Sequence, residues 1–118
     1  MERDARAFLW DVQQAANAID QFIAGLDAAG YEENALVRAA VERQFEIIGE
    51  ALNQLSKIAP GTARRVSDLR HIVGFRNILI HGYAAIDHGR VWHIAQTSLP
   101  RLRREVSALL AELGGAEP

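Results

Sequence analysis

Apolar residues recur along most of this chain at spacings of three and four, which is the period of an amphipathic helix. The first such segment runs from about Asp4 to Leu26, with apolar positions at Phe8, Val12, Ala15, Ile19, Phe22 and Leu26. Gly25 and the segment Asp27–Asn34 end this helix. We expect Tyr31 to fold from that loop onto the core.

A second repeat begins near Asn34 and continues to about Ser56, through Val37, Val41, Phe45 (or Gln44), Ile48, Leu52 and Leu55. Pro60 and Gly61 then break the chain, because a proline disfavours helix at the residue before it. We expect Thr62–Val66 to form at most a short helical turn that leads into the next helix.

A third helix is predicted from Ser67, which can act as its N-cap, to Gly82, where the helix end loosens. Its apolar stripe contains Leu69, Ile72, Val73 and Ile80. The last helix is expected after Asp87, with apolar positions at Val91, Ala95, Leu99 (or Ser98), Leu102, Val106, Leu109 and Leu113. Pro100 removes one backbone hydrogen bond within it and predicts a kink or break near Ser98.

Four helices with such apolar seams predict an all-α fold, an antiparallel four-helix bundle with a kinked last helix. At 118 residues, the chain is expected to form a single domain over residues 1–118, with 114–118 as a frayed tail. The composition agrees, because 49% of the residues are apolar and only 3 are prolines.

Composition and charge bound the environment and the partners. The chain has 0 cysteines, which excludes disulfides and thiolate metal sites and favours a reducing cytoplasm. The first residues open onto a mixed-charge helix, so we expect no signal peptide, and no apolar run reaches the roughly 20 residues that span a bilayer. The net charge of −2 does not indicate nucleic-acid binding. Contact with RNA would therefore use local patches, formed by Arg64, Arg65, Arg70 and Arg76 and by Arg101, Arg103 and Arg104.

The segment Arg76–Tyr83, at the end of the third helix, carries the most chemistry. Arg76 falls within the apolar stripe, and a guanidinium stays charged, so it needs a partner or a wet cleft there. An adjacent polar stripe contains Arg70, Gly74, Asn77 and His81. On an ideal helix Arg76 and His81 point about 140° apart. Loosening at Gly82, or a site formed where two surfaces meet, would bring them together, and the second option indicates a dimer.

Three charged residues on the second helix, Arg43, Glu46 and Glu50, are spaced so that they can form weak ion pairs on a solvated face. Alternatively, Glu50 supplies the counter-charge for Arg76 or accepts a hydrogen bond from His81. Gly49 beside it would let another helix backbone come close. The residues alone leave both alternatives open.

The residue types in this segment suit a phosphodiester substrate. A cation, an amide, an imidazole that titrates near neutrality and a phenol lie within eight residues. The chain contains no paired carboxylates like those of a glycosidase, no phosphate-binding glycine loop, no Cys/His metal cluster and no nucleotidyltransferase pattern. We therefore expect no metal and no cofactor. His88 and His93 do not share a helical face with His81, and we interpret them as surface or packing residues.

The spacing of Arg76, four residues, His81, one residue and Tyr83 resembles the R-x4-H-x-Y motif of HEPN-domain proteins. Flanking residues over nearly the whole chain are similar to the HepT branch, the toxin half of HEPN/MNT toxin–antitoxin pairs. They are Ile48–Ala51, Gly74–Asn77, Asp87, Val91–Trp92 and Leu99–Pro100. The resemblance implies a helical bundle, a homodimer, and a cognate MNT-type nucleotidyltransferase antitoxin that attaches AMP to Tyr83.

The leading hypothesis is a metal-independent endoribonuclease toxin that acts on RNA. His81 would serve as general acid or base, Arg76 would bind the phosphate, and Asn77 and Glu50 would support them. The competing hypothesis is a non-catalytic helical module that binds a nucleotide or a nucleotidyltransferase partner. The presence of both Arg76 and His81 favours the enzyme.

Overall fold

The computed structural model describes residues 3–114, apart from the side chain of Tyr83. Within this range every regular element is helical, so the predicted all-α fold is confirmed. The elements are α1 (Ala5–Ile23), α2 (Ala28–Glu33), α3 (Ala35–Ile58), α4 (Pro60–Ala63), α5 (Leu69–His81), the 3₁₀ turn η1 (Tyr83–Ala85) and α6 (His88–Glu112).

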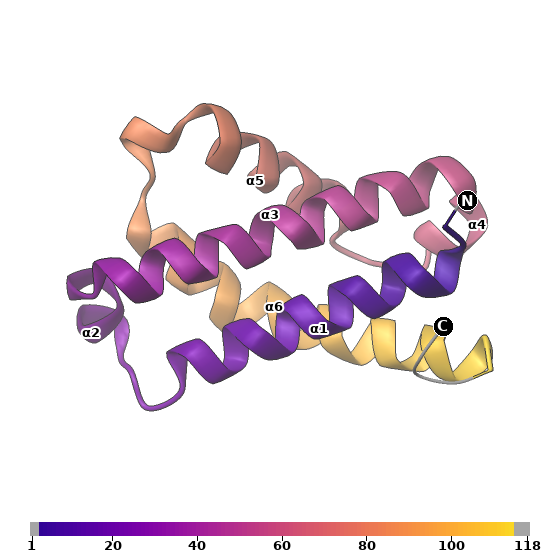
Figure 1. Cartoon of the computed structure of the whole chain (residues 1–118), viewed down its shortest axis with the longest axis horizontal. Coiled ribbons are helices and arrows are strands. Elements are labelled where there is room, and N and C mark those ends of the chain that lie inside the picture. The colour runs from indigo at the N-terminus through magenta and orange to yellow at the C-terminus, as the bar shows by residue number, and fades with distance from the viewer. Residues whose placement is uncertain (1–2, 115–118) are drawn as a thin grey trace.

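The four long helices, α1, α3, α5 and α6, form the expected antiparallel bundle (Figure 1). Helix α3 lies between α1 and α5 and packs along both, while α6 packs against α1. The start of α1 and the end of α6 lie at the same end of the molecule. None of the helices described is both long and apolar enough to cross a membrane.

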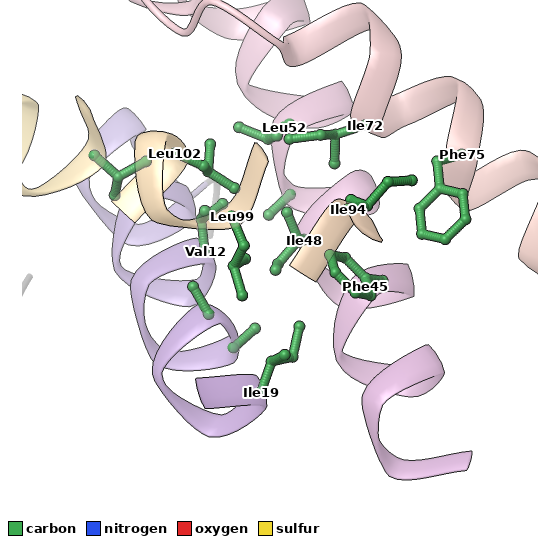
Figure 2. Packing of buried hydrophobic residues seen from close by; sticks show 14 of the residues in the cluster. Val12, Ile19, Phe45, Ile48, Leu52, Ile72, Phe75, Ile94, Leu99 and Leu102 are labelled. Atoms are coloured by element: carbon green, nitrogen blue, oxygen red, sulfur yellow. The ribbon is translucent and has the colours of Figure 1, made fainter. Parts of the chain in front are cut away.

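A continuous hydrophobic core joins these helices (Figure 2). The rings of Phe45 on α3 and Phe75 on α5 meet edge to face, with centroids 5.4 Å apart and an interplanar angle of 79°. Ile72 adds a second buried side chain from α5. Burial of each such side chain stabilises the fold by about 1.5–3 kcal/mol. These contacts fix α5, which carries the motif, against the middle of α3.

The N-cap expected at Asp87 is confirmed, Asn34 at the predicted start of the second helix caps α3, and the N-cap predicted for α5 is wrong. The Oδ1 atoms of Asn34 and Asp87 accept hydrogen bonds from the third backbone N–H of α3 and α6, at 3.0 and 3.1 Å. Ser67 does not cap α5, which begins at Leu69. Instead, the backbone N–H and the hydroxyl of Ser67 both donate to the carboxylate of Glu105 on α6. A contact distant in sequence therefore displaces the local cap.

The apolar stripe predicted for α5 is wrong at one end. Ile80 is 37% exposed, whereas Phe75 and Leu79, which that stripe omits, are buried. The reason is that α5 packs mainly against α3 alone, so it buries the narrow face formed by Ile72, Phe75 and Leu79. Two further predicted core positions, Phe22 on α1 and Leu113 after α6, are 38% and 40% exposed.

The segment predicted as a loop after α1 contains the short helix α2, whose start is capped by Asp27. Tyr31 lies on this helix and is 1% exposed, with its ring centroid 5.5 Å from that of Trp92. Its position on the core is therefore confirmed, although it comes from a helix.

The expected turn at Thr62–Val66 is present, since the backbone N–H groups of Arg65 and Val66 donate to the carbonyls of Thr62 and Ala63. It continues the short helix α4, which begins earlier, at Pro60, because proline is favourable at the first position of a helix. Helix α6 continues without a break through Pro100 from His88 to Glu112. The kink in α6 stays a prediction. The expected frayed tail lies outside the described residues, except for Gly114.

Candidate active site

Arg76 lies where α5 crosses α3, and its aliphatic stem covers Gly49. A Cβ atom built on Gly49 would lie 2.3 Å from the Cβ of Arg76 and 2.7 Å from its Cγ. No side chain fits at that position, so the glycine is what lets α5 approach α3 at this point. The predicted close approach at Gly49 is thereby confirmed, and its partner is the motif arginine.

The guanidinium of Arg76 is held by two neighbours. Its Nη2 donates to Oε2 of Glu50 at 2.5 Å, and its Nη1 donates to Oδ1 of Asn77 at 2.9 Å. The other carboxylate oxygen of Glu50 accepts from Nε2 of Gln54 at 3.0 Å. Because the side chain of Arg76 is only 24% exposed, this counter-charge offsets much of its desolvation. Glu50 thus occupies the position predicted by the second alternative.

The rest of the charged flank on α3 behaves as a solvated face. Arg43 and Glu46 form an ion pair of 3.4 Å, and the side chain of Arg43 is 68% exposed. Such a pair contributes about 0–1 kcal/mol. The solvated ion pair therefore describes Arg43 and Glu46, whereas the counter-charge for Arg76 describes Glu50.

A cavity of about 320 Å³ opens beside the Arg76–Glu50 pair, with walls from α1, α3 and α5. Two residues of its walls were not predicted from the sequence: Arg3, which precedes α1, and Asp11 on α1. These two residues form an ion pair of 2.5 Å, and this hydrogen bond raises the pKa of Arg3. Their spacing of eight gives no local signal that they would reach the motif. The cavity is open and lined by charged side chains, and the guanidinium of Arg76 at its edge is suited to bind a phosphate.

Asn77 and His81 lie on a different face of α5 from the cavity beside Arg76. Both side chains are exposed, and Asn77 lines a second cavity with Arg70 and Gly74. His81 is the last residue of α5, and Gly82 follows as the C-cap, as predicted. His81 does not contribute to the walls of the cavity that contains Arg76. Within a single chain, Arg76 and His81 therefore lie on the same helix but face different surfaces.

His88 and His93 fit their predicted surface or packing roles. The Nδ1 atom of His88 lies 3.9 Å from Oε2 of Glu42, and His93 is exposed on α6. Among residues 3–114, no three His, Asp or Glu side chains gather in a geometry that could hold a metal ion.

A family model described as "Ribonuclease HepT-like" matches residues 12–109, which include the whole site except Arg3, Phe8 and Asp11. The chain belongs to the HepT-like ribonuclease family. The resemblance carried by the R-x4-H-x-Y spacing and its flanks is thus confirmed at the level of the family.

Curated members related to this HepT-like chain match it over nearly their full length. "Putative RNase MJ1380" of Methanocaldococcus jannaschii is 36% identical over 105 residues, covering 89% of this chain and 95% of the relative. "Putative RNase MJ1216" of the same organism is 27% identical over 98% of this chain and 95% of its own length. "Probable ribonuclease HepT" of Thermococcus cleftensis is 28% identical over 92% and 98%. No solved structure matches the chain significantly.

In this HepT-like chain the backbone of Tyr83 begins the turn η1, directly after Gly82 and two residues beyond His81. The side chain of Tyr83 lies outside the described part of the structure, so its predicted modification stays a prediction. The backbone N–H of Ala85 donates to the carbonyl of Gly82 at 2.9 Å, which closes the turn. The chain thus turns away from the α5 axis between His81 and Tyr83.

Proposed function

We propose that this chain is a metal-independent endoribonuclease, the toxin of a HEPN/MNT toxin–antitoxin pair. The observation that carries the proposal is Arg76, held by Glu50 and Asn77 at the edge of an open cavity, one helical turn and a half from His81. Membership of the HepT-like ribonuclease family supports the same activity.

In the proposed mechanism the guanidinium of Arg76 binds the scissile phosphate and stabilises the charge that develops on it. Glu50 and Asn77 fix the direction of the guanidinium before the substrate arrives, which is the preorganisation that electrostatic catalysis needs. His81 transfers a proton, as general base on the 2′-hydroxyl or as general acid on the leaving oxygen. These roles use only side chains of the protein.

A homodimer would complete this site. Acid and base roles on opposite sides of one phosphate require two groups, and each chain supplies one His81 and one Arg76 on different surfaces. A two-fold axis that brings two α5 ends together would place both sets around one cleft. Light scattering at micromolar concentration should therefore give the mass of a dimer, and a monomeric mass would contradict the proposal.

The antitoxin is proposed to be an MNT-type nucleotidyltransferase that inactivates the enzyme by attaching AMP to Tyr83. The modified side chain would carry a phosphodiester next to the motif, where it competes with RNA for Arg76.

Two substitutions test the activity directly. Arg76→Ala and His81→Ala should each reduce RNA cleavage and growth arrest by at least about 10²-fold, the usual range for a lost acid–base or charge-stabilising group. Both variants should keep the helical circular dichroism of the parent. Arg38→Ala and His93→Ala are the controls, because Arg38 on α3 and the exposed His93 on α6 lie outside the motif and the cavities beside it. Cleavage should also persist in excess EDTA.

Other outcomes would favour the alternative. A folded wild-type chain that cleaves no RNA but binds a nucleotide or a nucleotidyltransferase would indicate the non-catalytic module. Cleavage that requires an added metal ion would contradict the mechanism. A mixture of the Arg76→Ala and His81→Ala proteins, denatured and refolded together, should recover part of the activity if one site draws on both protomers.

A further inference from the structure

Two neighbouring cavities extend from the motif towards α4, along the side of α5 that carries Asn77. The larger, of about 640 Å³, has Arg64, Arg70 and His71 in its walls. The smaller, of about 450 Å³, is lined by Asn53, Gly74 and Asn77 among others. Ser56, Leu69 and Arg70 contribute to both cavities, so the two are adjacent, and we call the pair the groove.

The arginines of this groove are not neutralised within the described part of the chain. Asp68, the acidic residue in its wall, pairs with Arg101 on α6 at 3.4 Å. Arg65, which neighbours the groove in sequence, is held by the carboxylate of Glu112 at 2.7 and 2.5 Å. Arg64 and Arg70 are exposed and form no ion pair among residues 3–114. The groove is therefore locally positive although the chain as a whole carries a charge of −2.

The groove leads to the motif along one face of α5. Arg70, Gly74, Asn77 and His81 recur at steps of four, three and four, so they fall within about 60° of one another and span about 16 Å of the helix. A Cβ atom on Gly74 would meet nothing within 4 Å, so packing within the chain does not require a glycine there. Because Gly74 has no side chain, the middle of this helix face is open to a ligand. At the far end, Asn77 accepts the hydrogen bond from Arg76.

We propose that this groove is a track for the sugar–phosphate backbone of a single-stranded RNA, which it leads into the motif. The inference rests on the proposed ribonuclease function and extends it to the strand beyond the scissile bond. Arg64 and Arg70 would neutralise phosphates. The side chains of Asn53, Ser56 and His71 can hydrogen-bond phosphate or 2′-hydroxyl oxygens.

The groove also predicts how the RNA is read. Among the residues whose side chains are described, no Phe, Tyr or Trp lines either cavity, so the imidazole of His71 is the one aromatic ring that the groove offers to a base. Contacts to the backbone position a strand but carry no sequence information. Binding along the track should therefore tolerate any sequence and depend strongly on salt.

The test measures binding of a fluorescent 2′-O-methyl RNA, which the enzyme cannot cleave, by anisotropy over a series of salt concentrations. Arg64→Ala and Arg70→Ala should each weaken binding and reduce the slope of log K against log salt by about 0.7, the value for one phosphate contact on a single strand. Arg38→Ala removes the same charge near the start of α3, outside both cavities and both arginine patches, and should leave the slope unchanged.

A second pair of variants uses the open position in the groove. Gly74→Glu should weaken binding much more than Gly74→Gln, because the two side chains have the same size and differ only in charge. Equal slopes for Arg64→Ala, Arg70→Ala and Arg38→Ala, or no binding by the wild type, would overturn the track. Cleavage of unmodified RNA is measured separately. Track-dependent binding without cleavage would refute the proposed function and leave the track standing.

Discussion

Gly49 and Arg76 are so close that a single methyl group on the glycine would overlap the arginine, at 2.3 Å from its Cβ. The atom that it would strike belongs to the rigid base of the side chain and not to its flexible end. The position of the guanidinium between Glu50 and Asn77 therefore depends on the absence of a side chain on the neighbouring helix. Stability and the site geometry are coupled at this contact.

Gly49→Ala should destabilise the protein and displace Arg76. Overpacking a close contact costs about 1–3 kcal/mol, which outweighs the gain of about 1 kcal/mol from replacing a glycine within a helix. Gly74→Ala is the matched control on α5, because its Cβ would enter open space and should stabilise the fold by about 1 kcal/mol. Urea unfolding of both variants gives the two free energies. If Gly49→Ala is as stable as Gly74→Ala, α3 and α5 do not approach as closely as described.

Two substitutions of Glu50 separate its charge from its contact with Arg76. Glu50→Gln keeps a carbonyl oxygen for the guanidinium but removes the competing negative charge, so RNA should bind more tightly and with a steeper salt dependence. Glu50→Ala removes the contact as well, so Arg76 is no longer held and kcat should fall. Glu46→Gln, which removes the same charge from the wall of the same cavity, should change binding less. Binding by anisotropy and single-turnover cleavage distinguish these effects.

The core positions of α3 could be predicted well from the sequence. On α3, which contacts both α1 and α5, the predicted apolar positions from Val41 to Leu55 are all buried. Helix α5 has one main neighbour, so a narrow apolar stripe is enough to pack against it. Several choices of that stripe are compatible with the apolar residues of α5. The choice of Phe75 over Ile80 for the core depends on the facing ring of Phe45, which no local pattern reveals. The same limit applies to Ser67, whose partner Glu105 is distant in sequence.

At the site, the charge of Arg76 indicated its partner, which the periodicity of apolar residues did not. A guanidinium on an apolar stripe needs a counter-charge, and this requirement led to Glu50. Gln54 lies four residues further along the same face and could have been included by its spacing. The Arg3–Asp11 pair could not be anticipated, because it reaches the cavity only through the packing of α1 on α3. The relation between Arg76 and His81 is proposed to involve a second chain, which the residues of one chain do not describe.

Glu42 should make stability depend on pH. Burial raises its pKa, against the opposing effect of His88, so the folded state binds the proton more tightly than the unfolded state. The stabilising contribution is therefore present below the unfolded pKa of about 4.3 and is lost as pH rises through the higher folded value. Glu42→Gln, which is neutral throughout, should become increasingly more stable than the wild type as pH rises from 4 to 7. Urea unfolding at several pH values measures this difference.

Glu112 provides a control of opposite sign. Its hydrogen bond from Arg65 lowers its pKa, so its contribution is present above the unfolded pKa and is lost as pH falls. Glu112→Gln should therefore become less stable than the wild type as pH rises, by a small amount because the pair is exposed. If both variants shift in the same direction, general charge effects and not these local environments set the pH dependence.

Tyr83 should be the residue at which a nucleotidyltransferase antitoxin acts. It follows Gly82 at the exposed end of α5 and begins the turn η1. An adenylate there would place a negative charge and a bulky nucleotide near Arg76, where the phosphate of the RNA is proposed to bind. Coulomb attraction would hold the modified side chain in place and exclude the substrate. The other tyrosine, Tyr31, is 1% exposed and is not accessible to an enzyme.

Co-expression with a small nucleotidyltransferase encoded in the adjacent reading frame tests this switch. Intact-mass spectrometry should show the addition of one adenylate, peptide mapping should place it on Tyr83, and the modified protein should no longer cleave RNA. Tyr83→Phe removes the acceptor oxygen but neither Arg76 nor His81, so this variant should cleave RNA and escape neutralisation. A neutralised pair in which Tyr83 is unmodified would show that the partner inhibits by binding, because the covalent charge at the motif would then play no part.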